Sequence, residues 1–333
     1  MHVVSNVPGL ERVAGPGTDV TVFSHQSCPK RWARNFALLR AALRADYLVI
    51  EFSLLEVEFF AVLLFLIPAG HCRLVTLDFF VAPKRKWQLP ATRWALRRIH
   101  RMLVYFRNSE TFEKMYGLPR SRFEYIPFKV NSWELVREAA ISDGGYIFVG
   151  GRSRRDFATL FNAVKDLPYP VKLLTAHEPE IIPHGSSLAG LSIPGNVEII
   201  YKDTDTRLFV ELVANARLVV LPIRQDSTVQ AGIGVYVMAM ALRKCLIISE
   251  GLGVSDVLQP HQACIVPPGN AGALHNAIET LWNDDARRSE YADAAWAYAS
   301  ELGGEDRLRE SVLRAIGANT RPVSDARDPG TAV

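Results

Sequence analysis

Short apolar runs rich in Val, Ile and Leu alternate along the chain with segments whose apolar residues recur every three to four positions. A bounded apolar run of four to eight residues predicts a buried strand, and the three-to-four period predicts an amphipathic helix. Strands separated by helices pair in parallel. The alternation therefore predicts α/β domains with helices on both faces of a parallel sheet.

The first half contains one such series. Its expected strands are 2–5, 19–23, 47–52, 73–78, 102–105 and 123–126, and its expected helices are 30–44, 54–66, 91–101 and 109–116. The stretch between the first two strands contains too much Gly and Pro for a full helix, so we expect a shortened β-α unit there.

A second series follows a connector over 131–145. Its expected strands are 146–149, 171–175, 197–201, 218–221, 245–248 and 263–266, and its expected helices are 156–165, 206–215, 231–243, 254–258, 271–282 and a helical end over 285–316. The fold class is therefore α/β, with two doubly wound Rossmann-like domains facing a cleft. We place the domains at 1–135 and 136–318, and expect a disordered polar tail over 319–333.

Composition narrows the class of protein. Four cysteines stand singly in or beside apolar runs, which argues for a reducing compartment and against a disulfide framework or a zinc site. The longest apolar run, 59–69, is much shorter than the roughly 20 residues of a spanning helix. We expect a cytoplasmic protein that is soluble or peripheral at the inner face of the membrane.

Charge is unevenly distributed. Residues 1–130 hold 19 Lys and Arg against 10 Asp and Glu, a net charge of +9, and the remainder holds 19 against 25, a net charge of −6. No acidic residue lies between Asp78 and Glu110, and we expect Trp94, Arg97, Arg98 and Arg101 within two turns of one helix. Basic residues with tryptophans suit an anionic membrane surface, and residues 30–34 repeat the pattern. A solvated helix face is the alternative, and the absence of a nucleic-acid-binding motif argues against nucleic acid.

The segment 218–256 predicts strand, loop, helix, strand, and a glycine-bearing turn opens its helix. That turn contains Gln230, Ala231, Gly232 and Gly234. Backbone N–H groups at a helix start attract anions, and glycine lets an anion approach closely. A tight packing turn between strand and helix is the alternative.

The second half resembles the nucleotide-sugar domain of GT-B glycosyltransferases, most closely those like family 4. Four segments in order carry the resemblance: YIFVGGRSRRDFATLFNAV (146–164), VEIIYKDTDTRLFVELVANARLVVLPI (197–223), AGIGVYVMAMALRKCLIISEGLGVSDVL (231–258) and CIVPPGNAGALHNAIETLWND (264–284). The first half matches more loosely, through LVTLDFF (74–80) and VYFRNSETFEKMYGLPRSRFEYIPFKVN (104–131).

The resemblance implies a metal-independent transfer from a UDP- or GDP-type nucleotide sugar. It places Gly150, Gly151 and Arg152 at the donor diphosphate, with Arg155 near the family's second basic position. A guanidinium can neutralise a departing diphosphate. In the alternative, Arg154 and Arg155 are solvated loop charges pairing with Asp156.

The chain departs from the family at one motif. The family's Glu-x7-Glu pair is replaced by Gln230 and Met238. Gln230 can still hydrogen-bond to sugar hydroxyls, but Met238 cannot anchor a ribose. The stereochemistry and the donor nucleotide are therefore left open.

Asp78 is the candidate general base of the first half. It ends an apolar strand at the carboxyl edge, where doubly wound sheets bind ligands, and it could deprotonate an acceptor hydroxyl. A turn aspartate is the alternative. His25, after the strand 19–23, is a weaker candidate at the same edge.

These observations together predict a glycosyltransferase acting on a lipid-linked or polysaccharide acceptor, with Asp78 and Arg152 as catalytic residues. Loss of the glutamate pair leaves two alternatives. One is a non-catalytic subunit that binds nucleotide sugar or membrane and supports a partner transferase, and the other is a GT-B nucleotide-sugar epimerase. The sugar, the base, the acceptor and the oligomeric state are not predicted.

Overall fold

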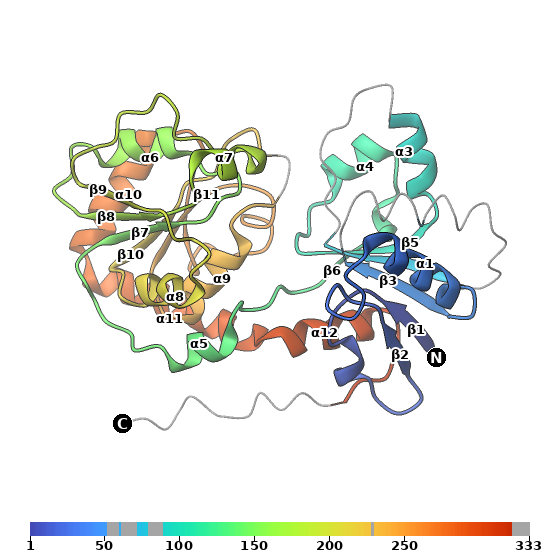
Figure 1. Cartoon of the computed structure of the whole chain (residues 1–333). Coiled ribbons are helices and arrows are strands. Elements are labelled where there is room, and N and C mark those ends of the chain that lie inside the picture. The colour runs from blue at the N-terminus through green and yellow to red at the C-terminus, as the bar shows by residue number, and fades with distance from the viewer. Residues whose placement is uncertain (52–59, 61–71, 79–88, 228–229, 322–333) are drawn as a thin grey trace. The chain divides into compact units, whose positions relative to one another are not determined.

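The computed structural model describes residues 1–51, 60, 72–78, 89–227 and 230–321. The chain divides into two compact units, one of Met1–Pro127 with Glu305–Val333 and the other of Phe128–Gly304. Each unit is built around one six-stranded sheet with parallel strands. Figure 1 shows helices around each sheet. Two doubly wound α/β units are therefore confirmed.

The sheet of the first unit has the strand order β2-β1-β3-β4-β5-β6. Its strands are β1 (His2–Ser5), β2 (Asp19–Val22), β3 (Tyr47–Glu51), β4 (Arg73–Leu77), β5 (Ile99–Val104) and β6 (Phe123–Tyr125). All but one end residue of β3 and of β4 is buried. Strands covered on both faces read as continuous apolar runs, which is why the sequence predicts them well.

Helices and short 3₁₀ turns connect these strands: η1 (Leu10–Val13), α1 (Arg31–Ala42), α3 (Leu89–Leu96), α4 (Glu110–Tyr116) and η3 (Arg120–Arg122). A further helix of this unit, α12 (Glu305–Ala315), follows the second unit in the chain. The shortened unit between β1 and β2 is confirmed, because η1 takes the place of a helix there. Helix α12 packs on η1, and the Nε of Arg309 donates to the Pro8 carbonyl at 2.8 Å.

One helix expected in the first unit is wrong over its second half. The helix expected over 91–101 ends at Leu96, and the chain enters β5 at Ile99. Pairing of β5 with β4 overrides the helical pattern, and the register shifts between Leu74 and Val75. The helix expected over 54–66 lies outside the described residues, apart from Phe60.

The sheet of the second unit has the order β12-β11-β10-β7-β8-β9. Its strands are β7 (Ile147–Gly150), β8 (Val171–Leu174), β9 (Val197–Ile200), β10 (Leu218–Leu221), β11 (Leu246–Ser249) and β12 (Cys264–Val266). The helices are α5 (Trp133–Glu138), α6 (Phe157–Val164), α7 (Glu178–Ile181), η4 (Ile182–His184), α8 (Thr206–Ala214), α9 (Ile233–Ala241), α10 (Ala271–Asn283) and α11 (Asp285–Leu302).

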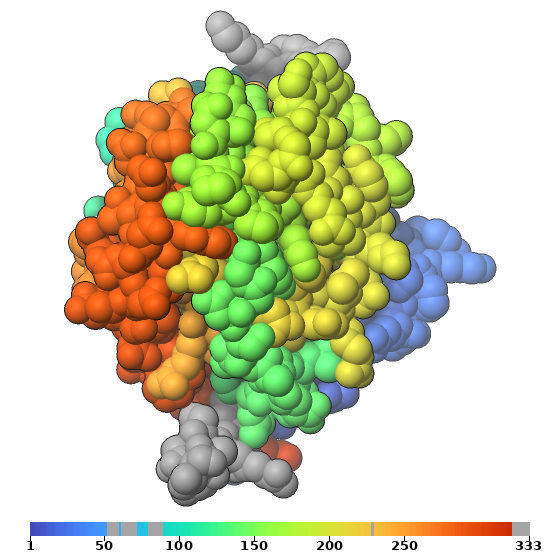
Figure 2. Space-filling view, turned by 90° about the vertical axis from the view of Figure 1, so that its left-hand side faces the viewer, coloured from blue at the N-terminus to red at the C-terminus, as the bar shows by residue number. Residues whose placement is uncertain are grey.

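Helices cover both faces of this second sheet. On one face, α6 and α10 pack on each other and share one apolar cluster with the sheet. Figure 2 shows them from outside, α6 in green and α10 in orange. On the other face, α9 packs against α8 and α11.

The end of the chain differs from the expectation. Residues 254–258 form turns, not a helix, and the helical end is split at Gly303 and Gly304 into α11 and α12. Residues 319–321 are also anchored to the first unit, since Thr320 bridges Ala14 and the Arg321 N–H donates to the Val13 carbonyl at 2.9 Å. The units therefore divide at Pro127 and Gly304, whereas the sequence suggested boundaries after residues 135 and 318.

Candidate functional site

The second sheet reverses its winding direction between β7 and β10. Strands β8 and β9 extend from β7 on one side, and β10, β11 and β12 continue on the other. At such a switch point the loops beyond the carboxyl ends of the two strands diverge, and ligands bind between them. The loops 151–156 and 222–232 hold or border every site residue predicted for this unit.

Backbone hydrogen bonds fasten these two loops to each other. The Asp156 N–H donates to the Pro222 carbonyl at 3.0 Å, and the Arg224 N–H donates to the Arg154 carbonyl at 2.9 Å. Between these bonds, Arg155 and Ile223 form an antiparallel bridge. The backbone of Arg155 is therefore fixed between hydrogen bonds that join the two loops.

Arg155 is a buried cation, 3% exposed. Its Nε donates to the Gly150 carbonyl at 2.8 Å and its Nη1 to the Ser153 carbonyl at 2.7 Å. Burial lowers the pKa of Arg155 to about 10, so it still carries a full charge near pH 7. Across the described ranges, Arg155 forms no salt bridge, and Asp156 caps α6 instead by accepting from the Thr159 N–H at 3.0 Å. The alternative of a solvated Arg155 paired with Asp156 is therefore wrong.

Two glycine turns lie against the Arg155 guanidinium. A Cβ at Gly151 would lie 2.5 Å from its Nη2, and a Cβ at Gly232 would lie 3.5 Å from both terminal nitrogens. Both glycines have positive φ, 102° and 82°. Gly150 has no room for a larger residue for a different reason. A Cβ at this position would lie 2.7 Å from the Phe148 ring.

Arg152, the neighbouring basic residue, is already paired. Its guanidinium binds the Asp203 carboxylate with two hydrogen bonds, one of them from Nη2 to Oδ1 at 2.9 Å. The hydrogen bond to Asp203 raises the pKa of Arg152. An anion that approached Arg152 would have to compete with a carboxylate that is 7% exposed.

Helix α9 begins at this site without a side-chain cap. Its N-cap is Gly232, and the first turn contains Gly234, whose Cβ position would lie 2.6 Å from the Asn131 Nδ2. Asn131 in turn accepts from the Lys129 Nζ at 2.6 Å. Uncapped N–H groups at a helix start favour an anion.

The residues that replace the family's glutamates have different surroundings. Gln230 is half-buried at the end of the loop, and Ala231 is buried beside it. Met238 is 6% exposed within the core on α9, so it packs and does not face solvent.

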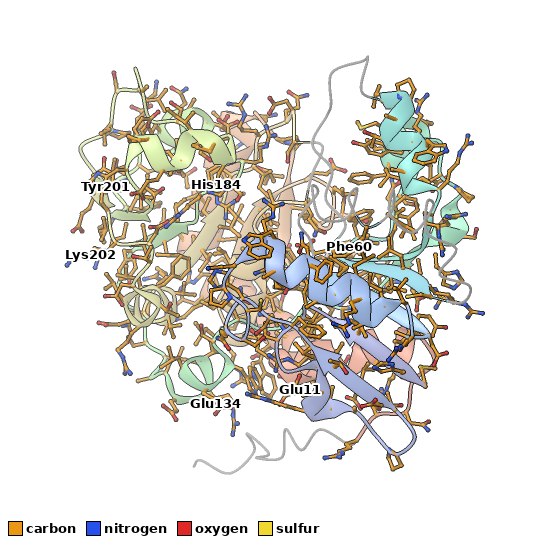
Figure 3. The ribbon with its side chains drawn as sticks, turned by 45° about the vertical axis from the view of Figure 1, so that its right-hand side comes forward. Glu11, Phe60, Glu134, His184, Tyr201 and Lys202 are labelled. Carbon is orange, nitrogen blue, oxygen red and sulfur yellow. The ribbon has the colours of Figure 1, made fainter. Side chains whose placement is uncertain are left out.

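Aromatic rings lie at the carboxyl ends of the next two strands. His177 after β8 stacks on Tyr201 after β9, with ring centroids 4.3 Å apart and planes 11° apart. Tyr201 is 43% exposed, and Figure 3 labels it beside Lys202. Sequence reasoning did not single out Asp203, Asn131, His177 or Tyr201, because each reaches the site through a tertiary contact that no local pattern reveals.

Asp78 follows β4 in the first unit, in the left-handed region at φ 57°. Its N–H donates to the Leu103 carbonyl of β5 at 3.0 Å. Burial, and then the charges of Asp78, Glu51 and Glu305, raises the pKa of Tyr105 well above its usual value. The negative charges of Asp78, Glu51 and Glu305 therefore act on a Tyr105 phenol that stays neutral.

The other sequence candidates of the first unit are dispersed. His25 is exposed after the edge strand β2, three strands from β4, which is about 14 Å at the usual spacing. Trp94 lies on α3, Arg98 lies beyond the end of α3, and Arg101 lies on β5, so the single basic helix is wrong. Two arginines of this stretch bind other groups of the first unit: Arg93 on α3 donates to the Met115 carbonyl, and Arg101 pairs with Glu124 at 2.7 Å. Residues 84–87 lie outside the described residues.

In the part of the chain that the structure describes, no three His, Cys, Asp or Glu side chains gather as a metal site would require. All four cysteines are free.

Comparison with solved structures supports the fold. HepE from Anabaena, in complex with UDP, is similar over 90% of this chain and 86% of that chain, at 16% identity and a TM-score of 0.66. Sucrose-phosphate synthase from Thermosynechococcus elongatus is similar over 95% of this chain and 88% of that chain, at 14% identity and a TM-score of 0.63. A trehalose-6-phosphate synthase studied for glycosyl transfer with retention is similar over 96% of this chain and 100% of that chain, at 13% identity and a TM-score of 0.61. No family model matches the sequence, and no curated protein matches it either. The chain has the GT-B fold of these structures.

Proposed function

We propose that this protein is a glycosyltransferase that binds the diphosphate of a nucleotide sugar at Arg155. The observation that carries the proposal is a buried guanidinium without a carboxylate partner in the described chain, lying against two glycine turns at the switch point of the sheet. Burying a cation is costly unless an opposite charge accompanies it. A diphosphate would supply that charge, and the uncapped start of α9 would bind a second phosphate oxygen.

The donor in this proposal is a UDP-sugar. HepE is described in complexes with UDP, with UDP and glucose, and with UDP-glucose. The stacked His177 and Tyr201 lie one and two strands beyond β7, roughly 5 to 10 Å away at the usual strand spacing, which suits the base end of a nucleotide. A GDP-type donor is the alternative to be tested.

The acceptor in this proposal is a lipid-linked or polysaccharide glycan at the cytoplasmic face of a membrane, so that the protein would serve polysaccharide biosynthesis. The net charge of +9 over residues 1–130 supports this, because an anionic surface attracts a basic unit. The transfer needs no metal ion in this scheme.

In the reaction, the bond between the anomeric carbon and the β-phosphate oxygen breaks and a bond to an acceptor oxygen forms. Arg155 and the α9 N-terminus stabilise the charge that develops on the leaving diphosphate. Asp78 takes the proton of the acceptor hydroxyl in an inverting single displacement. In the competing scheme, the leaving phosphate takes that proton and the anomeric configuration is retained. The similar trehalose-6-phosphate synthase was studied for glycosyl transfer with retention.

Substitution of the two arginines tests the donor site. Arg155→Met keeps most of the buried volume but removes the charge, so UDP affinity should fall at least about tenfold while uridine affinity stays within about twofold. Arg155→Lys, which keeps the charge, should recover part of the loss. Arg152→Met should have a smaller effect, because Asp203 already neutralises Arg152. Isothermal titration with UDP and uridine makes the measurement. Equal losses for both ligands in Arg155→Met would contradict a diphosphate contact.

A non-catalytic subunit and a nucleotide-sugar epimerase are the competing functions. Both stay open because Gln230 and Met238 stand where the glycosyltransferase family has its glutamate pair. A transferase hydrolyses its donor slowly to free sugar, whereas a non-catalytic subunit leaves it intact. An epimerase interconverts free nucleotide sugars without an acceptor.

A further inference from the structure

Helix α1 of the first unit presents an apolar stripe outward. Trp32, Phe36, Leu39 and Leu43 follow one another at spacings of four, three and four, which places them on one face of a helix. Trp32 is 73% exposed, Phe36 65% and Leu43 47%, whereas Leu38 and Ala42 on another face of the helix are buried in the core. Large aromatic side chains with this exposure normally indicate a contact surface.

A hollow of about 650 Å³ accompanies the stripe. Its described lining comes from one face of α1: Arg31, Trp32, Asn35, Phe36 and Leu39. The lining is mostly apolar, with a guanidinium and a carboxamide at its border. Such a hollow has room for a hydrocarbon chain whose polar end stays near a cation.

The charged residues of α1 and of the sequence on either side of it are of one sign. Lys30, Arg31, Arg34, Arg40 and Arg44 lie on or beside the helix, and no acidic residue occurs from residue 20 to residue 45. Helix α1 therefore combines exposed aromatic residues with a run of cations. A typical protein partner would require complementary carboxylates, but a phosphate-bearing lipid surface supplies continuous negative charge above a hydrocarbon layer.

We infer that α1 docks on an anionic membrane, with Trp32 and Phe36 inserted at the level of the headgroups and the cations of the helix against lipid phosphates. Each cation near such a surface contributes about 1 kcal/mol. No helix among the described residues is long and apolar enough to span a bilayer. The inference bears on the proposed function only by bringing the first unit to a lipid-borne acceptor.

Vesicle flotation tests this inference with the full-length protein. Wild type should bind vesicles of phosphatidylcholine with phosphatidylglycerol at low salt, release them at high salt, and bind pure phosphatidylcholine weakly. The double variant Trp32→Ser with Phe36→Ser should bind the anionic vesicles at least about tenfold more weakly. A second double variant, Arg31→Gln with Arg40→Gln, should lose salt-dependent binding while its aromatic residues remain.

A matched control removes exposed apolar side chains from the other unit. Ile182 is 57% exposed and Ile193 52%, and their double substitution by Ser should leave vesicle binding unchanged. Melting temperatures and UDP affinity should be the same in all variants, so failure of the docking and failure of the donor site are separate results.

Three outcomes would overturn the inference. In the first, wild type ignores anionic vesicles at low salt. In the second, the aromatic double variant binds them as tightly as wild type. In the third, wild type is a dimer in solution and the aromatic variant is a monomer, which would mean that a second copy of the chain covers the stripe.

Discussion

Three arginines in one turn occupy three different environments. Arg152 pairs with Asp203, the Arg154 side chain lies against Gly185, and Arg155 is buried between two glycine turns. They have the same chemistry and adjacent positions, so only tertiary contacts distinguish them. The sequence could indicate a basic turn after β7, but Asp203 comes 51 positions after Arg152, and nothing local predicts their pairing.

Asp78 can be tested with a substitution that suits its backbone. Its φ of 57° is tolerated by Asn, so Asp78→Asn should fold normally while losing the proton acceptor. If Asp78 is the general base, turnover should fall by about 10²-fold or more with donor affinity unchanged. Single-turnover kinetics and the anomeric proton of the first-formed product, followed by NMR, make the measurement. Near-normal turnover, or a retained configuration, would exclude Asp78 as the base.

Lys244 gives a pH-dependent prediction for stability. It is 6% exposed, its Nζ donates to the Ser142 carbonyl at 2.7 Å, and burial lowers its pKa to about 8. The folded state therefore releases this proton at lower pH than the unfolded state. The free energy of unfolding should rise with pH between about 8 and 10.5 through this group.

The variant Lys244→Met isolates that contribution. Below pH 8 it should be more stable than wild type, and its advantage should shrink by up to about 3 kcal/mol as pH approaches 10.5. Urea unfolding of both proteins across this range makes the comparison. A constant difference would show that Lys244 keeps its usual pKa in the fold.

At the scale of elements, the substitution Gly151→Ala tests whether the turn after β7 positions the Arg155 guanidinium. Gly151→Ala places a Cβ 2.5 Å from the Arg155 Nη2, so the guanidinium must move. Gly190 also has positive φ but no atom within 4 Å of its Cβ position, so Gly190→Ala carries the backbone strain without the contact. Both variants should lose about 1 kcal/mol or more of stability.

UDP affinity should separate the two alanine variants. Gly151→Ala should weaken UDP binding at least about tenfold, because the displaced guanidinium no longer meets the phosphate. Gly190→Ala should bind UDP like wild type. Titration calorimetry checks both, and equal affinities would mean that Arg155 does not depend on the turn.

The sequence predicted most strands to within two residues, because strands buried on both faces leave continuous apolar runs such as Leu218–Leu221. It failed where a sheet took over a helical pattern, as at Ile99, and where apparent periodicity ended in turns, as at 254–258. Gly303 and Gly304 were a visible signal for a helix break. The sequence could not show that the helix after them belongs to the other unit, because that depends on packing against η1.

At the scale of the whole molecule, α12 links the end of the chain to its beginning. Leu308, Val312 and Leu313 are buried, and each such side chain contributes about 1.5–3 kcal/mol. A chain that stops at Gly304 should therefore lose much of the stability of the first unit and leave the second unit folded.

Hydrogen exchange followed by mass spectrometry locates the effect of this truncation. Peptides from β1 and β3 should lose protection, and those from β7 and β10 should keep it. A chain that stops at Arg321 should behave like wild type, since it retains α12 and the bridge at Thr320. Loss of protection in the second unit instead would contradict the division of the chain.

The same division sets an order of events during synthesis. The second unit is one continuous segment, whereas the first consists of two segments separated by Phe128–Gly304. A ribosome adding about 5–20 residues per second needs on the order of ten seconds or more to make that segment. Strands β1 to β6 therefore wait for α12, which is made only after the whole second unit. The second unit can finish folding while the first is still incomplete.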